Sequence, residues 1–187
     1  MAIIIFDLDD TLYDTTRFRK DIEQVFASHG FPEADIRESY RSVVSTRGYT
    51  FEEHIRELAK KHSNLDPILF LPNLLALFEK TYIFPGVLET LEQLKNSYTL
   101  VLVTLGEEKI QRLKIENAGI EKYFNSIHSI EKDKEKLLRD LNFQGEIYFV
   151  NNNLVENEKV RKHFPHFVVI DAKSGEPVVI PSSPLDR

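Results

Sequence analysis

Cysteine and tryptophan are absent from this chain of 187 residues, and methionine occurs once. Without cysteine the protein has no disulfides, no thiolate metal ligands and no cysteine nucleophile. No apolar run approaches the roughly 20 residues of a membrane span, and the run Ile3–Phe6 is short and lacks the basic leader of a signal peptide. We therefore expect a cytoplasmic protein that does not associate with membranes.

Positive charge is in modest deficit, since 24 Lys and Arg face 30 Asp and Glu and give a formal charge of -6. Such a balance offers no general attraction to nucleic acid or to anionic membranes. A hydrophobic content of 42% and a charged content of 29% are typical of a soluble globular protein. The length suits one core domain with a modest insertion, and the oligomeric state stays open.

The N-terminal stretch changes abruptly from apolar to acidic. Ile3–Phe6 predicts a central strand of a parallel sheet, and Asp7 and Asp9 follow it directly. Ligand sites of open α/β sheets lie beyond the carboxyl ends of the strands. Two acids this close both ionise comfortably only with a cation between them or in an asymmetric environment. The pattern indicates a nucleophile, a general acid/base and a cation such as Mg²⁺, with an Asp-rich turn as the alternative.

The segment from Phe6 to Asp14 resembles the first motif of the haloacid dehalogenase superfamily, most of whose members are Mg²⁺-dependent phosphohydrolases. The resemblance implies that Asp7 attacks phosphorus to form an aspartyl-phosphate. It implies that Asp9 protonates the leaving oxygen and then activates water. Dehalogenases of the superfamily lack this second acid, so Asp9 favours phosphoryl chemistry over carbon chemistry.

Beyond Asp14 the hydrophobic pattern is helical as far as residue 83, beginning with a helix at Arg17–His29 capped by Thr15 or Thr16. We interpret residues 15–83 as an inserted helical cap and residues 1–14 and 84–187 as an α/β core. Strands and helices alternate in the core, which predicts a doubly wound, Rossmann-like parallel sheet. The expected strands are Tyr98–Val103, Asn125–Ile130, Glu146–Val150 and His166–Ile170. The expected helices between them are Glu107–Asn117, Asp133–Leu141 and Val155–His163.

The second core strand leads into Thr104, Leu105 and Gly106. A hydroxyl and a glycine before an acidic helix start suit an anion held by Thr104 and by the backbone N–H groups that follow. The second motif of the superfamily is a Ser or Thr at this place, commonly followed by Asn-Gly, and Leu105 replaces that Asn. We predict a phosphate-binding segment, with Thr104 as a plain helix N-cap as the alternative.

A charge run follows the third core strand. A site that holds a phosphate and two carboxylates benefits from a fixed ammonium, and the third motif of the superfamily supplies such a Lys. We favour Lys132, immediately after the strand, over Lys134, and expect Lys136 to lie on a solvated helix face.

The fourth strand end departs from the superfamily pattern of Gly-Asp followed by a further acid. Asn152 stands at the Asp position and Glu156 follows four residues later. An Asn carbonyl still ligates Mg²⁺, so the predicted metal ligands are Asp7, Asp9, Asn152 and Glu156. One formal negative charge is missing, which predicts a weaker metal site or none. A run of Asn that only caps the next helix is the alternative.

These motifs predict a phosphatase that uses Mg²⁺ to hydrolyse a small phosphorylated metabolite, such as a sugar phosphate or nucleotide, enclosed by the cap. Two alternatives stay open: a phosphomutase or other phosphotransferase, and a degenerate relative that binds a phosphorylated ligand or a partner without turnover. In the cap, Arg17, Lys20 and Arg47 are candidates for contact with a substrate carboxylate or phosphate.

Overall fold

A five-stranded parallel sheet forms the core of the protein in the computed structural model, which describes residues 1–44, 49–62 and 67–180. The strand order is β3-β2-β1-β4-β5, so the N-terminal strand is the central one. The strands are β1 (Ala2–Phe6), β2 (Tyr98–Leu105), β3 (Ser126–Ile130), β4 (Ile147–Asn151) and β5 (Phe167–Asp171). The predicted doubly wound parallel sheet is confirmed, and the predicted ends of its strands and helices lie within two residues of the observed ones.

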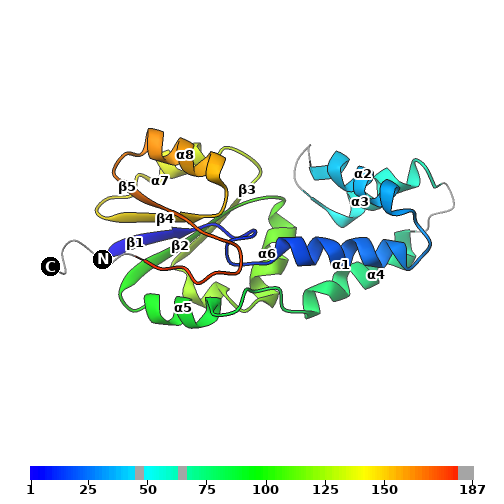
Figure 1. The fold of residues 1–187 in the computed structure, drawn as a ribbon, viewed down its shortest axis with the longest axis horizontal. Helices are drawn as coiled ribbons and strands as arrows, with labels where there is room; N and C mark the ends of the chain where they lie inside the picture. Colours follow the sequence, from blue (N-terminus) through cyan, green and yellow to red (C-terminus); the bar gives the residue numbers. More distant parts are fainter. Residues whose placement is uncertain (45–48, 63–66, 181–187) are drawn as a thin grey trace.

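Helices cover both faces of the sheet because β1 is apolar on both. Ile4 and Phe6 point to one face and pack in the cluster that includes residues of α5 (Val87–Leu94) and α6 (Glu108–Asn117). Ile5 points to the other face and packs with residues of α7 (Lys134–Leu141) and α8 (Leu154–His163). All three side chains are fully buried. The two helical layers lie on opposite sides of the sheet in Figure 1.

A helical cap lies beyond the carboxyl ends of the strands (Figure 1). Its elements are α1 (Thr15–Ala27), α2 (Glu33–Val44), α3 (Phe51–Ala59), α4 (Pro67–Leu75) and the 3₁₀ helix η1 (Ala76–Glu79). The two crossings between cap and core run side by side, since the N–H of Asp14 donates to the Tyr82 carbonyl at 2.7 Å and that of Phe84 to the Leu12 carbonyl at 3.1 Å. This pairing fixes where the cap leaves the sheet.

The start of α1 differs from the sequence expectation. Asp14, not a threonine, caps this helix: its side chain accepts from the N–H of Arg17 at 2.8 Å. Thr15 is therefore the first helical residue, and its hydroxyl is free to point back toward the strand ends.

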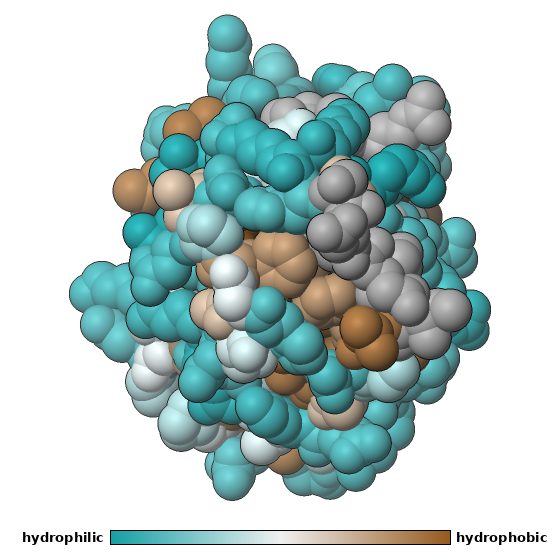
Figure 2. Space-filling view, turned by 90° about the vertical axis from the view of Figure 1, so that its right-hand side faces the viewer, coloured by the Kyte–Doolittle hydropathy of each residue, from teal (hydrophilic) through white to brown (hydrophobic). Residues whose placement is uncertain are grey.

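The surface of the cap is mostly hydrophilic, with apolar residues showing between the polar ones (Figure 2). Its interior is aromatic: Phe18, Phe26 and Phe51 are at most 2% exposed and stack with neighbouring rings. None of the helices in the described ranges is long and apolar enough to cross a membrane.

The buried histidine of the cap makes its stability depend on pH. His54 is 0% exposed; its Nδ1 accepts from the Tyr49 hydroxyl at 2.9 Å and its Nε2 donates to the Ile36 carbonyl at 3.2 Å. Burial lowers the pKa of His54 from 6.5 to about 4. Between these two values the unfolded chain binds the proton that the folded chain excludes, so this contribution to stability is lost as the pH falls.

We expect the free energy of unfolding to fall by up to about 3 kcal/mol from pH 7 to pH 4 through His54 alone. Urea unfolding at a series of pH values measures it. The matched control is His54→Gln, which keeps polar atoms at the site but does not titrate. If the wild type and this variant lost stability with the same pH dependence, His54 would not be the group responsible.

Candidate active site

Asp7 lies directly beyond β1 and is bound by a buried lysine. Its N–H donates to the Val150 carbonyl at 2.9 Å, so the residue extends the pairing of β1 with β4. Its side chain is 9% exposed, and Lys134 Nζ lies 2.8 Å from its Oδ1. The same ammonium lies 3.0 Å from Oε2 of Glu156. One cation thus links the acids that follow two neighbouring strands.

The surroundings of Asp7 set its ionisation. Burial raises the pKa of this carboxyl from 3.8 to about 6, although the Lys134 ammonium pulls it down. Asp7 is consequently ionised at neutral pH. Its Oδ1 is directed to Lys134, while its Oδ2 takes only a long contact of 3.2 Å from the Thr11 hydroxyl. Oδ2 is therefore the oxygen with spare capacity for an electrophile or a cation.

The prediction that Lys132 is the lysine of the site is wrong, because Lys134 is the one that contacts Asp7. Lys132 is exposed, whereas Lys134 is 6% exposed and bound to Asp7. The reason is local: Asp133 adopts a left-handed conformation with φ 62° and caps α7 by accepting from the Lys136 N–H at 2.9 Å. This turn leaves Lys132 outside and makes Lys134 the first residue of the helix that faces the strand ends.

Asp9 is held by three donors. Lys114 Nζ lies 2.6 Å from its Oδ1, Gln111 Nε2 lies 2.7 Å from its Oδ2, and the Thr15 hydroxyl also donates to Oδ1. Burial by itself would raise the pKa of Asp9, but Lys114, Thr15 and Gln111 together outweigh burial and the pKa is lowered. In this arrangement Asp9 is an ionised carboxylate anchored to α6 and to the first residue of the cap.

Gln111 also occupies the predicted phosphate segment. Its Nε2 lies 2.6 Å from Thr104 Oγ1 and 2.9 Å from the Leu105 carbonyl, in addition to Asp9. Two amide hydrogens therefore serve three acceptors, so at least one contact is shared. Thr104 itself is fully buried within β2.

Gly106 makes room for Gln111. It has a φ of 153°, and a Cβ at this position would approach the Gln111 side chain to 3.0 Å. Its N–H donates to the Ile130 carbonyl at 2.8 Å. The Gly106 N–H is thus directed to the neighbouring strand end in this structure, and the phosphate-binding role of Thr104, Leu105 and Gly106 stays a prediction.

The sequence reasoning missed Gln111 and Lys114, which are 2% and 6% exposed. Both lie on the buried face of α6, between the apolar residues Ile110 and Ile115. The sequence did hold a signal for these two residues: they are polar, three positions apart, and lie where helical periodicity predicts core residues. Such a pair indicates that buried polar groups contact the helix, and here these groups are Asp9 and Thr104.

The fourth strand end meets Asp7 through Thr11. The Thr11 hydroxyl lies 3.2 Å from both Asp7 Oδ2 and Asn152 Oδ1, and it accepts from the Asn152 N–H at 3.1 Å. The hydroxyl carries a single hydrogen, so it donates to one of the two oxygens at a time. The neighbouring Asn153, not Asn152, caps α8 with its side chain.

Of the four predicted metal ligands, three are linked through shared partners, since Thr11 contacts Asp7 and Asn152 and Lys134 contacts Asp7 and Glu156. Asp7 and Asn152 converge on Thr11, whereas the Asp9 carboxylate is directed to Lys114 and Gln111. Glu156 accepts from Lys134 and from Asn151 Nδ2, both at 3.0 Å. Within the described part of the chain, no three His, Cys, Asp or Glu side chains are grouped as metal ligands. The metal-binding role of these residues stays a prediction.

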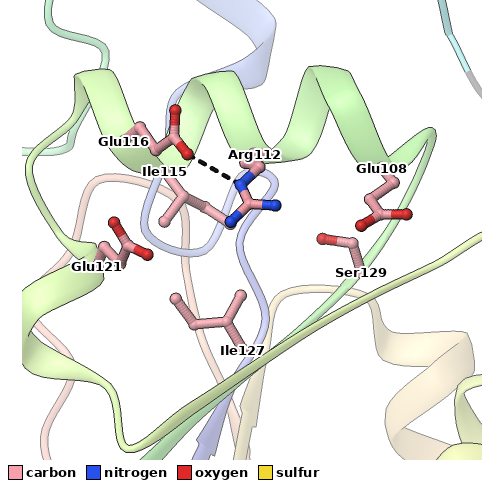
Figure 3. Close-up of a pocket in the computed structure, with 7 residues that line it drawn as sticks. All are labelled: Glu108, Arg112, Ile115, Glu116, Glu121, Ile127 and Ser129. Atoms are coloured by element: carbon pink, nitrogen blue, oxygen red, sulfur yellow. Dashed lines mark hydrogen bonds and ion pairs between the residues drawn. The ribbon is translucent and has the colours of Figure 1, made fainter.

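Two cavities flank this site, and Leu105 lines both. One, of about 210 Å³, lies between cap and core; Asp9, Thr15, Gln111 and Lys114 line it together with apolar and aromatic cap residues. The other, of about 290 Å³, is lined by Lys134 and Glu156. Figure 3 shows a third pocket, of about 150 Å³, between α6 and β3. It holds none of the predicted site residues, and the arginine that lines it, Arg112, is paired with Glu116 at 2.9 Å.

The fold and the site define a class: a parallel α/β core whose first strand ends in two acids, with a helical cap over the strand ends. Residues 4–137, more than half of the chain, match the haloacid dehalogenase-like hydrolase family. The chain belongs to this family, which confirms the resemblance of its first motif.

A curated relative is a glyceraldehyde 3-phosphate phosphatase from Methanothermobacter thermautotrophicus, 27% identical over 139 residues. The match covers 68% of this chain but 62% of the relative, so the chain spans under two thirds of that protein.

Solved structures share the fold at low identity. A haloacid dehalogenase-like hydrolase from Burkholderia xenovorans aligns with a TM-score of 0.70 at 16% identity, over 90% of this chain and 80% of that one. A HAD-hydrolase from Bacillus subtilis, bound to magnesium, aligns with a TM-score of 0.63 at 15% identity, over 91% and 94%. L-2-haloacid dehalogenase from Xanthobacter autotrophicus aligns with a TM-score of 0.60 at 16% identity, over 89% and 75%.

Proposed function

We propose that this protein is a phosphatase that hydrolyses a small phosphomonoester through an aspartyl-phosphate on Asp7. The observation that carries the proposal is the buried contact of 2.8 Å between Asp7 Oδ1 and Lys134 Nζ, which leaves Oδ2 as the nucleophilic atom. The relative that is a phosphatase supports phosphorus as the electrophile. Asp9, two residues away, supplies the second carboxylate that the phosphatase reaction needs.

Each side chain has a separate task in the proposed reaction. Lys134 orients Asp7 and stabilises negative charge on the transferring phosphoryl group. Asp9, an ionised carboxylate, takes a proton from the water that hydrolyses the aspartyl-phosphate, and Lys114 and Gln111 position it. The Nε2 of Gln111 contacts both the Asp9 carboxylate and the buried Thr104 hydroxyl, so this hydroxyl lies near the same carboxylate.

The residues present fit a weakly held Mg²⁺. Asp7 Oδ2 and Asn152 Oδ1 are oxygen donors that share one hydroxyl, and neither Asp7 Oδ2 nor Glu156 Oε1 is directed to a lysine or an amide of the described residues. Magnesium keeps several waters when proteins offer it few ligands. When bound, it would neutralise phosphate charge beside the nucleophile. Both oxygens of Asp9 accept from neighbouring side chains, whereas Glu156 accepts from Lys134 and Asn151 through Oε2, which leaves its Oε1 as a further candidate ligand.

The test is turnover of p-nitrophenyl phosphate and of a panel of phosphorylated metabolites at about neutral pH. Each assay is run once with about 5 mM Mg²⁺ and once with a chelator. We expect release of inorganic phosphate that depends on the metal. A protein that hydrolysed no phosphomonoester but released halide from a 2-haloacid would overturn the proposal in favour of carbon chemistry.

Restoring the missing charge at Asn152 should tighten the metal site. Asn152→Asp adds a carboxylate beside Asp7 Oδ2, so we expect about 10-fold tighter Mg²⁺ binding by isothermal titration calorimetry. The control is Asn153→Asp, which adds the same charge at the cap of α8. Equal Mg²⁺ affinity in Asn152→Asp and the wild type would show that residue 152 does not contact the ion.

A second candidate is a family member that binds phosphorylated ligands without turnover. It is favoured by one observation, that Lys114 and Lys134 already neutralise the acids beside the site. Calorimetry with a phosphomonoester, beside the turnover assay, separates the two functions: binding without release of phosphate supports this candidate.

A further inference from the structure

A basic pocket opens on the cap between α1 and α2. Its volume is about 550 Å³, and it is lined by Arg19, Lys20, Glu23, Arg37, Tyr40 and Arg41. Four cationic side chains thus surround one carboxylate, in a chain whose overall formal charge is -6. Because the protein as a whole is acidic, this local concentration of positive charge indicates a site for an anionic ligand.

The charges inside this basic pocket are not balanced. Glu23 is shared, since its two oxygens lie 3.7 Å from Arg19 and 3.7 Å from Arg37. Arg37 has a further partner in Glu33 at 2.9 Å. Arg41 and Lys20 are exposed and take part in no ion pair with another described residue. Their donors are therefore available to a ligand.

Tyr40 lies between the basic pocket and the cavity beside the active site. It lines this pocket and also the cavity of about 210 Å³ that holds Asp9 and Lys114. The Arg19 guanidinium lies over its ring at 5.8 Å from the centroid. Burial raises the pKa of Tyr40; the charge of Arg19 opposes that rise and that of Asp9 adds to it. The tyrosine therefore lies within reach of the charges on both sides.

Another candidate from the sequence, Arg17, does not contribute. Its guanidinium donates to the Thr81 carbonyl and lies 4.8 Å from the centre of the Tyr82 ring, so it serves the junction between cap and core. Arg47 lies outside the described residues.

We propose that the substrate carries a second anionic group, a carboxylate or a second phosphate, which binds in the basic pocket beside Arg41 and Lys20 while its phosphoryl group meets Asp7. This inference rests on the proposed function. Arginine suits the role because its planar donors match both kinds of anion. The part of the ligand between the two anions passes Tyr40.

The experiment compares matched pairs of probes that differ by one anionic group. Glycerol 3-phosphate is paired with 3-phosphoglycerate, and fructose 6-phosphate with fructose 1,6-bisphosphate, so that two spans are sampled. We expect the wild type to show a KM about 10-fold lower for the two-anion probe of at least one pair. In Arg41→Ala and in Lys20→Ala/Arg41→Ala that preference should disappear, with kcat and the KM for the one-anion probe unchanged.

The matched control is Arg56→Ala, which removes an exposed cap arginine that does not line the basic pocket. It should keep the wild-type preference. Absence of any preference in the wild type, or an equal rise in KM for both probes of a pair in Arg41→Ala, would overturn the inference. So would tight, Arg41-dependent binding of heparin without discrimination between the small probes, because that describes a polyanion surface.

Failure of the proposed function is detected separately. If no probe is hydrolysed, titration calorimetry of the same pairs against Asp7→Asn and Asp7→Asn/Arg41→Ala measures the second site without turnover. Binding of a two-anion probe that weakens about 10-fold when Arg41 is removed upholds the site although the phosphatase proposal fails. Equal affinity in these two variants overturns the site as well.

Discussion

Asp7→Asn should reduce kcat for p-nitrophenyl phosphate by on the order of 10⁵-fold, as removal of a nucleophile does in other hydrolases that form covalent intermediates. The substitution exchanges one carboxylate oxygen for an amide nitrogen and keeps the size of the side chain. The remaining carbonyl oxygen has no formal charge and does not form an acyl phosphate. Phosphate release under single-turnover conditions measures the loss at the chemical step.

Asp10→Asn is the matched control, three residues along the same turn. The Asp10 carboxylate accepts from the Thr16 N–H at 3.1 Å, which an Asn carbonyl reproduces. The residue has a φ of 55°, and Asn tolerates that left-handed conformation well. We expect less than about a threefold change in kcat. If Asp7→Asn retained activity within tenfold of the wild type, Asp7 would not be the nucleophile.

Lys134→Met should lower kcat by about 10²–10³-fold, whereas Lys132→Met should leave it unchanged. The two substitutions remove the same charge from positions two residues apart, but only Lys134 lies 2.8 Å from Asp7. Methionine keeps the length and apolar character of the lysine stem. Steady-state kinetics with p-nitrophenyl phosphate measures both variants.

Lys134→Met leaves the carboxylates of Asp7 and Glu156 without their shared cation, and breaking such a buried pair costs about 3–5 kcal/mol. Urea unfolding therefore accompanies the kinetics. Lys134→Met/Glu156→Gln removes one of the stranded charges and should recover part of the stability but not the activity. Loss of activity in Lys132→Met equal to that in Lys134→Met would contradict the assignment.

The two lysines of the site have distinct positions around the acids. Lys134 comes from α7 and bridges Asp7 to Glu156, while Lys114 comes from α6 and binds Asp9. Each carboxylate of the first motif therefore has its own cation, on opposite faces of the sheet. This division gives the acids different environments, which is the asymmetry that two neighbouring carboxylates need to take different roles.

Local sequence patterns were enough to predict the central strand and the acids at its end. Ile4 and Ile5 place apolar side chains on opposite faces of the strand, a pattern typical of a parallel strand that is covered on both sides. Asp7 follows at the carboxyl end of this strand, where such sheets bind ligands. The alternation of strands and helices likewise determined the doubly wound sheet. These features follow from local periodicity, so short segments of the sequence are enough to predict them.

Which charged side chains enter the site depends on contacts between elements that are distant in the sequence. Lys132 and Lys134 have the same chemistry and stand in the same charge run, and the left-handed Asp133 separates them by turning the helix start inward. Lys114 is buried because Asp9, 105 residues away, offers it a partner. Pairing between distant elements offsets the desolvation of a buried ion, and the partners come from contacts that local sequence patterns do not contain.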